Sequence, residues 1–180
     1  MASKIKVDQI QTIDGSGTIA LQNQLSGMTT ASLPALGSAQ MPTGSVLQVV
    51  QGSTGTTVES TSSSYADTGL SASITPSSTS SKILVTVHQN GGLKESTQSG
   101  VSVQLYRGSS VLTKLSHAAG YNAQNQVAYQ GAISTEYLDS PSTTSAVTYK
   151  TQFGNNQSVS SAHVQVGGCT SFITLMEIKG

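Results

Sequence analysis

The sequence predicts an all-β protein, an antiparallel β-sandwich of jelly-roll type preceded by an extended N-terminal arm. Three observations predict this fold. Apolar and polar residues alternate with period two in short runs, clusters of Gly, Pro, Ser and Asn separate the runs, and no long window has helical periodicity. About eight or nine runs follow residue 44, which suits two stacked sheets.

The first 44 residues predict a different structure from the rest of the chain. Their apolar residues fall in short pieces, and residues 26–44 are mostly Gly, Ser, Thr, Ala and Pro. Such a segment buries too little apolar surface to fold alone. We therefore predict that residues 1–44 form an arm that becomes ordered on a partner. The side chains expected to anchor it are Ile5, Val7, Ile10, Ile13, Ile19 and Leu21.

Residues 45–180 predict a β-sandwich head domain that also carries the contacts between copies. Turn-forming clusters lie at residues 75–78, 90–92, 107–110, 140–142 and 154–156. Residues 101–107 and 111–116 predict a tight hairpin around Gly108. The predicted strands are residues 45–51, 70–74, 82–89, 101–107, 111–116, 126–137, 146–153, 159–166 and 172–179.

Two of the predicted strands carry apolar side chains on both faces. In residues 82–89, Leu84 lies opposite three aliphatic residues, and residues 172–179 are apolar on both sides. Burying both faces requires a second surface, which a neighbouring copy in a homotrimer would supply. A single well-covered central strand would have the same pattern. The residues predicted for the core or the oligomer interface are Ile83, Val85, Val87, Phe172, Ile173, Leu175, Met176 and Ile178.

The composition favours assembly over charge-driven recognition. Charged residues are 9% of the chain and the formal net charge is zero, whereas about 25% is typical. No cluster of Lys and Arg predicts nucleic-acid binding. A neutral, hydroxyl-rich protein has little self-repulsion, so we expect that many copies can pack side by side. A secreted or adhesive β-domain would have the same polarity.

No pattern in the sequence predicts catalysis, a metal site or a cofactor. Cys169 is the single cysteine, which excludes an intrachain disulfide, and we expect a reduced thiol. Glu136 and Asp139 are the two acids close in sequence, and they are more typical of a solvated loop than of a hydrolytic pair. No nucleophile elbow or phosphate-binding loop occurs. The histidines lack the spacing of metal ligands, and they are His88, His117 and His163.

Tyrosines provide one candidate for ligand contact. Tyr121 and Tyr129 flank a segment with the Tyr, Asn and Gly composition of an adaptable binding loop, and tyrosine rings stack on sugars. Tyrosines in alternating strands are also common at core edges and interfaces. A host-glycan contact at these two residues is therefore the alternative functional prediction.

The N-terminus and hydropathy predict no export signal and no membrane insertion. The first residues lack the apolar core of a signal peptide, and no apolar stretch approaches the 18 residues of a membrane span. We expect synthesis in a cytoplasm.

Five segments resemble small structural proteins of tailed bacteriophages. They are SKIKVDQIQT at residues 3–12, GTIAL at 17–21, GSVLQVV at 44–50, ITPSSTSSKILV at 74–85 and ITLMEIK at 173–179. The resemblance implies a protein of the virion surface, made in the host cytoplasm. Such a protein would be a trimeric capsid decoration protein, short fibre or spike whose arm docks on capsid or tail proteins.

The resemblance carries no catalytic residue. Three functions remain as alternatives: a structural virion component, an adhesin that binds host glycans, and a depolymerase. The last requires paired acids or an activated nucleophile, which the sequence does not supply.

Overall fold

The computed structural model describes residues 37–95, 99–121, 129–157 and 160–180, and within them the chain is all-β. Each predicted run overlaps a strand, and Val58–Ser60 is a strand that the sequence did not predict. Two 3-10 helices among these residues are η2 (Ser38–Gln40) and η3 (Val166–Gly168). The strands are β1 (Val46–Thr54), β2 (Val58–Ser60), β3 (Ala66–Ile74), β4 (Lys82–Lys94), β5 (Val101–Arg107), β6 (Ser110–Ala119), β7 (Tyr129–Asp139), β8 (Val147–Asn155), β9 (Ala162–Val164) and β10 (Ser171–Ile178).

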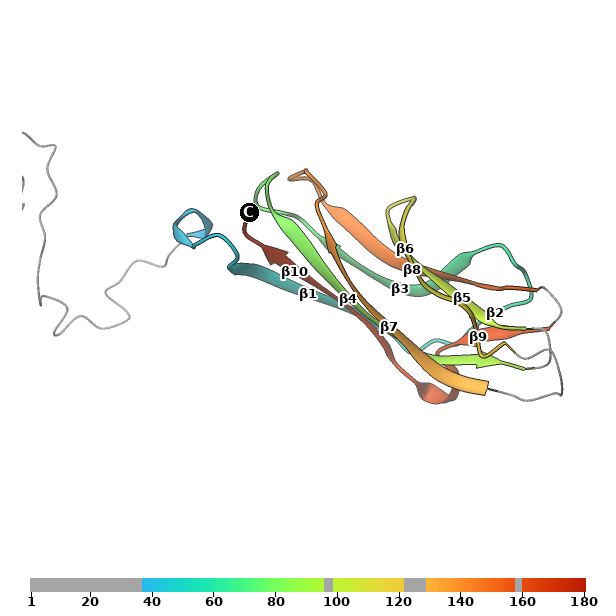
Figure 1. Ribbon diagram of the computed structural model, residues 1–180. Coiled ribbons are helices and arrows are strands. Elements are labelled where there is room, and N and C mark those ends of the chain that lie inside the picture. The colour runs from blue at the N-terminus through green and yellow to red at the C-terminus, as the bar shows by residue number, and fades with distance from the viewer. Residues whose placement is uncertain (1–36, 96–98, 122–128, 158–159) are drawn as a thin grey trace, which may run out of the picture. The chain divides into compact units, whose positions relative to one another are not determined.

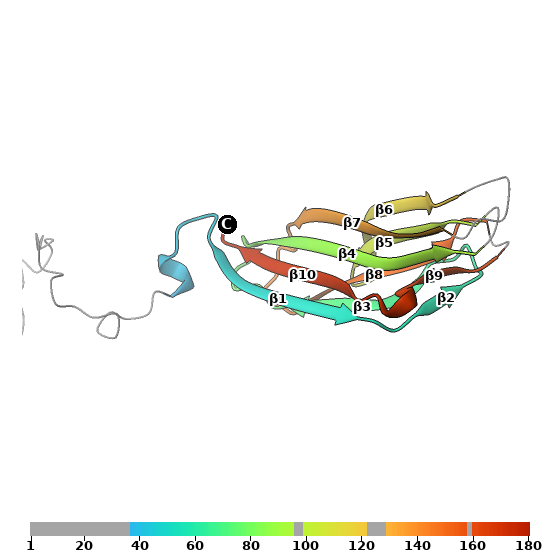
Figure 2. The same cartoon turned by 90° about the horizontal axis from the view of Figure 1, so that it is seen from below.

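Two antiparallel sheets pack face to face (Figure 1 and Figure 2). Sheet A contains the neighbours β1, β10, β4 and β7, with β9 and β2 beside the far end of β4. Sheet B has the order β3-β8-β5-β6. The chain crosses between the sheets after β2, β3, β4, β6, β7 and β8. This arrangement is that of a jelly roll, so the predicted sandwich is confirmed.

Side-chain alternation explains why these segments form half-buried strands. In β3, Leu70, Ala72 and Ile74 are 1%, 9% and 2% exposed, whereas Ser71 and Ser73 point to solvent. The predicted hairpin is also confirmed, because β5 and β6 pair from Arg107 and Ser110 onward around a two-residue connection.

The core lies between the sheets and consists mainly of aliphatic side chains. From sheet A it receives Ile83, Val85, Val87, Ile173 and Leu175, each 0% exposed. Fully burying each such side chain contributes about 1.5–3 kcal/mol. The other fully buried hydrophobic residues, from sheet B and β9, are Leu105, Val103, Tyr149, Phe153, Ala162 and Val164.

The predicted turn at residues 90–92 is wrong, because β4 continues through it to Lys94. The register between β4 and β7 shifts between Gln89 and Gly92, which marks a β-bulge. Gly91 has a φ of +60°, and a Cβ there would lie 2.7 Å from the backbone nitrogen of Val166. Glycines can mark a bulge or a close backbone approach inside a strand as well as a turn.

The sandwich has two ends with different connections (Figure 1). At the end that we call the terminal end lie the start of β1, the C-terminal Gly180, and the turns 75–81 and 140–146. At the opposite, distal end lie β2, β9 and the C-terminal ends of β4, β6 and β8. Residues 37–44 belong to the same compact unit as the strands, and Gly44 donates its backbone N–H to Lys179.

Candidate functional site

The outer face of sheet A carries the first candidate site. Val49 of β1 lies opposite Met176 of β10, Met176 lies opposite Leu84 of β4, and Leu84 lies opposite Leu138 of β7. Because directly paired residues share a face of the sheet, these four side chains form one apolar row across four strands. We call Val49, Met176, Leu84 and Leu138 the outer apolar row.

Exposure is greatest at the two edges of the outer apolar row. Val49 is 57% exposed and Leu138 is 53% exposed, whereas Met176 and Leu84 are half-buried. Toward the terminal end, Val46 is 49% exposed and pairs with Ile178. The apolar surface therefore reaches from the start of β1 across the whole sheet.

Polar rows border this surface on its distal side. The neighbouring row contains Gln51, Thr174, Thr86 and Glu136, and the next contains Ser53, Phe172, His88 and Ser134. Phe172 is 37% exposed, and His88 Nδ1 lies 3.0 Å from Ser134 Oγ. Glu136 is the charged residue of these two rows, and Lys82 lies on the other side of the outer apolar row, where it pairs with Ile178. A sheet face with so few charges presents little electrostatic barrier to another protein surface.

The structure divides the residues predicted for the core or interface into two sets. Ile83, Val85, Val87, Ile173 and Leu175 form the core and are fully buried within one chain. The other three lie on the outer face of β10, with Met176 in the outer apolar row, and they are Phe172, Met176 and Ile178.

The sequence did not single out Val49 and Leu138, the two most exposed members of the row. A register shift between Val46 and Gln48 breaks the alternation of β1, so the outward position of Val49 was hidden. Leu138 follows the predicted strand at residues 126–137, and β7 extends past the predicted end to Asp139. The sequence feature that could have indicated this row is Leu84, which gives β4 a second apolar face.

Asp139 forms a buried ion pair that joins the sheets near the terminal end. Arg107 Nη1 donates to both carboxylate oxygens of Asp139 at 2.9 and 2.8 Å, and the hydroxyl of Tyr149 donates to Oδ2 at 2.7 Å. Burial, and then the hydrogen bond to Asp139, raise the pKa of Tyr149. Asp139 is 6% exposed, so its interpretation as a loop-solubilising acid is wrong. Glu136 points to the opposite face of β7, so the two carboxylates do not face one another.

Glu177 is a second buried carboxylate at the terminal end. It is 0% exposed and accepts hydrogen bonds from the backbone N–H of Ser77 at 2.7 Å and from its hydroxyl at 2.6 Å. Ser81 Oγ and Gln48 Nε2 also donate to it, each at 2.6 Å. Burial alone would raise the pKa of Glu177, but these hydrogen bonds outweigh it and lower the pKa. The carboxylate thus holds β1, β10 and the turn before β4 together.

The remaining titratable groups do not form a cluster in the described ranges. His163 Nε2 lies 2.9 Å from a carboxylate oxygen of Glu95, and Cys169 follows the turn of η3. Lys94 is 1% exposed, and its Nζ has no hydrogen-bond partner there, which nothing in those ranges explains. No group of three or more His, Cys, Asp or Glu residues in the described part of the chain is placed to hold a metal ion.

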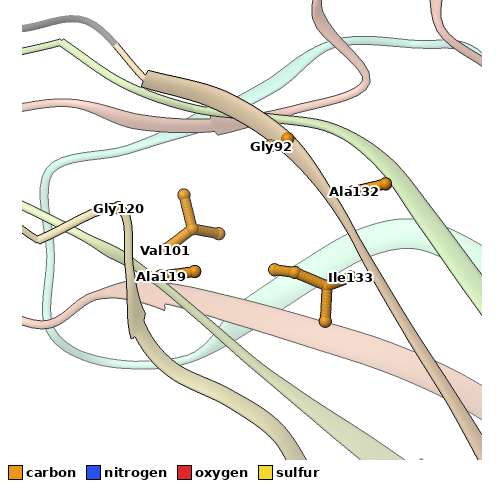
Figure 3. A pocket seen from close by; sticks show the side chains of 7 residues that line it. Gly92, Val101, Ala119, Gly120, Ala132 and Ile133 are labelled. Atoms are coloured by element: carbon orange, nitrogen blue, oxygen red, sulfur yellow. The ribbon is translucent and has the colours of Figure 1, made fainter.

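A small slot opens between the sheets toward the distal end (Figure 3). Its volume is about 90 Å³, and Val101 and Ile133 project into it. Its other lining residues are Gly92, Ala119, Gly120, Gly131 and Ala132. None of these side chains can hydrogen-bond to a sugar hydroxyl, so polar contacts within the slot could come only from the backbone.

Tyr121, predicted to contact a glycan, directly follows the slot residue Gly120 and is 44% exposed. The backbone of Tyr129 pairs with Lys94 in sheet A, and its side chain lies outside the described residues. Whether the two rings act together stays a prediction.

The predicted anchoring residues of the arm, Ile5, Val7, Ile10, Ile13, Ile19 and Leu21, lie outside the described residues. No helix among those described is long and apolar enough to cross a membrane. In comparisons with known proteins, no family model and no curated protein matches the chain.

Proposed function

We propose that this chain is a non-enzymatic structural component of a bacteriophage virion surface. It acts as a trimeric capsid decoration protein, or as a short fibre or spike, and its N-terminal arm docks on capsid or tail proteins. The observation that carries this proposal is the outer apolar row, an exposed apolar surface on a nearly uncharged jelly roll. Exposed apolar surfaces of this kind mark contacts with other proteins.

The composition supports assembly into a crowded particle. With 9% charged residues and a formal net charge of zero, neighbouring copies repel one another little. The buried carboxylates of Asp139 and Glu177 contact groups of their own chain and serve its folding. Their arrangement offers no water-exposed acid and base pair for hydrolysis.

The arrangement of the two ends supports an anchored module. The chain enters the domain at the start of β1, at the terminal end, while β6, which ends just before Tyr121, has its C-terminal end at the distal end (Figure 1). A domain attached to a particle through the start of β1 would therefore have its distal end facing away from the particle. A protein displayed on a particle surface requires this arrangement, with its attachment at one end and a free surface at the other.

Deleting residues 1–36 is expected to leave a folded domain that no longer enters phage particles, because residues 37–180 form a compact unit with its own core. Purified particles from cells that express tagged full-length or truncated protein would be compared by immunoblot. We expect at least a tenfold loss of incorporation.

A matched pair of arm variants separates anchoring from arm length. Changing Ile5, Val7 and Ile10 together to Ser removes apolar anchors, whereas changing Gln9, Gln11 and Thr12 to Ser keeps them. Only the first variant should lose incorporation. Normal incorporation of the truncated protein, with its circular dichroism unchanged, would contradict the anchoring role.

Glycan binding by the distal end is a second candidate function, favoured by the exposure of Tyr121. A tyrosine ring at an exposed loop can stack on the apolar face of a sugar. If this function is correct, a glycan array probed with the purified chain will give signals that fall at least tenfold in Tyr121→Ala. Tyr65→Ala, in another exposed segment, serves as the control. Signals that Tyr121→Ala leaves unchanged would rule out this contact.

A further inference from the structure

We infer that the outer apolar row is the contact between copies of this chain, with the β1 side of one copy against the β7 side of the next. This inference rests on the proposed assembly and names the surface that performs it. The occupant of the exposed sheet face is thus a second copy of the same protein.

The distribution of exposure along the row points to contact at both sheet edges. Val49 on β1 and Leu138 on β7 are the most exposed, and the central Met176 and Leu84 are already half-buried. In a closed ring with its axis parallel to the strands, each copy contacts one neighbour through its β1 side and the other through its β7 side. Val49 of one copy then meets Leu138 of the next.

The neighbouring polar row fits the same register. Gln51 lies two residues after Val49 on β1, and Glu136 lies two residues before Leu138 on the antiparallel strand β7. A contact that places Val49 on Leu138 therefore brings Gln51 level with Glu136. Within one copy, Gln51 Nε2 donates to Thr174 Oγ1 at 3.0 Å. The second hydrogen of the same amide group can donate to the Glu136 carboxylate of the next copy.

Size and charge are also adequate for self-association. Four strands spaced about 4.8 Å apart and about eight residues long give a face of roughly 19 by 25 Å. In a closed trimer each contact uses half of this face from each of two copies, so the three contacts together bury on the order of 1,400 Å², and closure of the ring makes them act together. Lys82 and Glu136 have opposite charges, so the face carries no net charge to repel its equivalent in another copy.

A charge exchange across the row tests the pairing directly. In full-length protein, Val49→Lys alone and Leu138→Glu alone each place a charge in an apolar contact, so both should lower the mass measured by light scattering to that of one 18.4 kDa chain. The double variant Val49→Lys, Leu138→Glu should recover the wild-type mass. Within one copy the two positions are three strand spacings, about 14 Å, apart, so a local ion pair cannot explain recovery.

Controls keep the test decisive. Val49→Lys combined with Leu138→Lys should remain a monomer, and Val111→Lys, on the exposed part of β6 in sheet B, should keep the wild-type mass. Far-ultraviolet circular dichroism confirms that each variant is folded. A double variant that stays monomeric, or single variants that keep the wild-type mass, would overturn the pairing.

Another occupant of the face would give a different pattern. If the arm of the same chain covered the row, the wild type would be a monomer, and either single variant would expose residues 1–36 to protease. That result would overturn this inference but leave particle incorporation unaffected. The failure of the inference can therefore be told from the failure of the proposed function.

Discussion

Replacing Asp139 by alanine is expected to lower the free energy of unfolding by about 3 kcal/mol. The change leaves the Arg107 guanidinium and the buried Tyr149 hydroxyl without the acceptor that joins β5, β7 and β8. Breaking a buried pair by removing one partner costs about 3–5 kcal/mol. The lower figure applies because the Arg107 side chain is 34% exposed and can be rehydrated.

Glu136→Ala on the same strand is the matched control for Asp139→Ala. Its side chain lies on the exposed outer face, so we expect a change within about 0.5 kcal/mol. Urea unfolding followed by circular dichroism measures both variants under conditions where the chain is a monomer. Equal effects of the two substitutions would show that the ion pair contributes nothing to the fold.

Replacing Glu177 by alanine is the second change with a large expected effect. It leaves the backbone N–H and hydroxyl of Ser77, the hydroxyl of Ser81 and the amide of Gln48 without their acceptor. A buried unsatisfied donor costs about 1–3 kcal/mol, and rotation of the hydroxyls recovers part of this cost. We expect a loss of about 3 kcal/mol in the free energy of unfolding.

Glu177 should also make the stability depend on pH. Because its pKa is lower in the folded chain than in the unfolded chain, its contribution is fully present above the unfolded value of about 4.3. That contribution is lost as pH falls from about 5 through the lowered, folded-state pKa. At concentrations where the chain is a monomer, Glu177→Gln should therefore flatten the acid side of a plot of melting temperature against pH, whereas Glu136→Gln should leave it steep. An unchanged slope in Glu177→Gln would contradict the assignment.

The strands could be predicted from sequence because their signal is local. Leu70-Ser71-Ala72-Ser73-Ile74 alternates within five residues, and each side chain takes the face that the alternation predicts. The prediction of a turn at Asn90-Gly91-Gly92 was wrong for a physical reason. Glycines also occur at a β-bulge, where the strand continues past them. Which of the two occurs depends on the backbone around Val166, far along the chain.

The candidate site depended on information that no local pattern contains. Val49, Leu84, Leu138 and Met176 become neighbours only through the register of four strands. Glu177 meets Ser77 across 100 residues of sequence, and Asp139 meets Arg107 across 32. An isolated acid in the sequence therefore gave no indication that it was buried. The second apolar face of β4 and β10 could be recognised in the sequence, and the outer apolar row lies on the sheet that contains both strands.

The mass of the wild-type chain in solution tests the central claim most directly. Sedimentation equilibrium across a hundredfold range of concentration would follow association of the 18.4 kDa chain. The account predicts a species of three chain masses that dissociates, if at all, only at the lowest concentrations. A stable, compact monomer at the highest concentration would mean that the outer apolar row needs no second copy, and it would contradict the account.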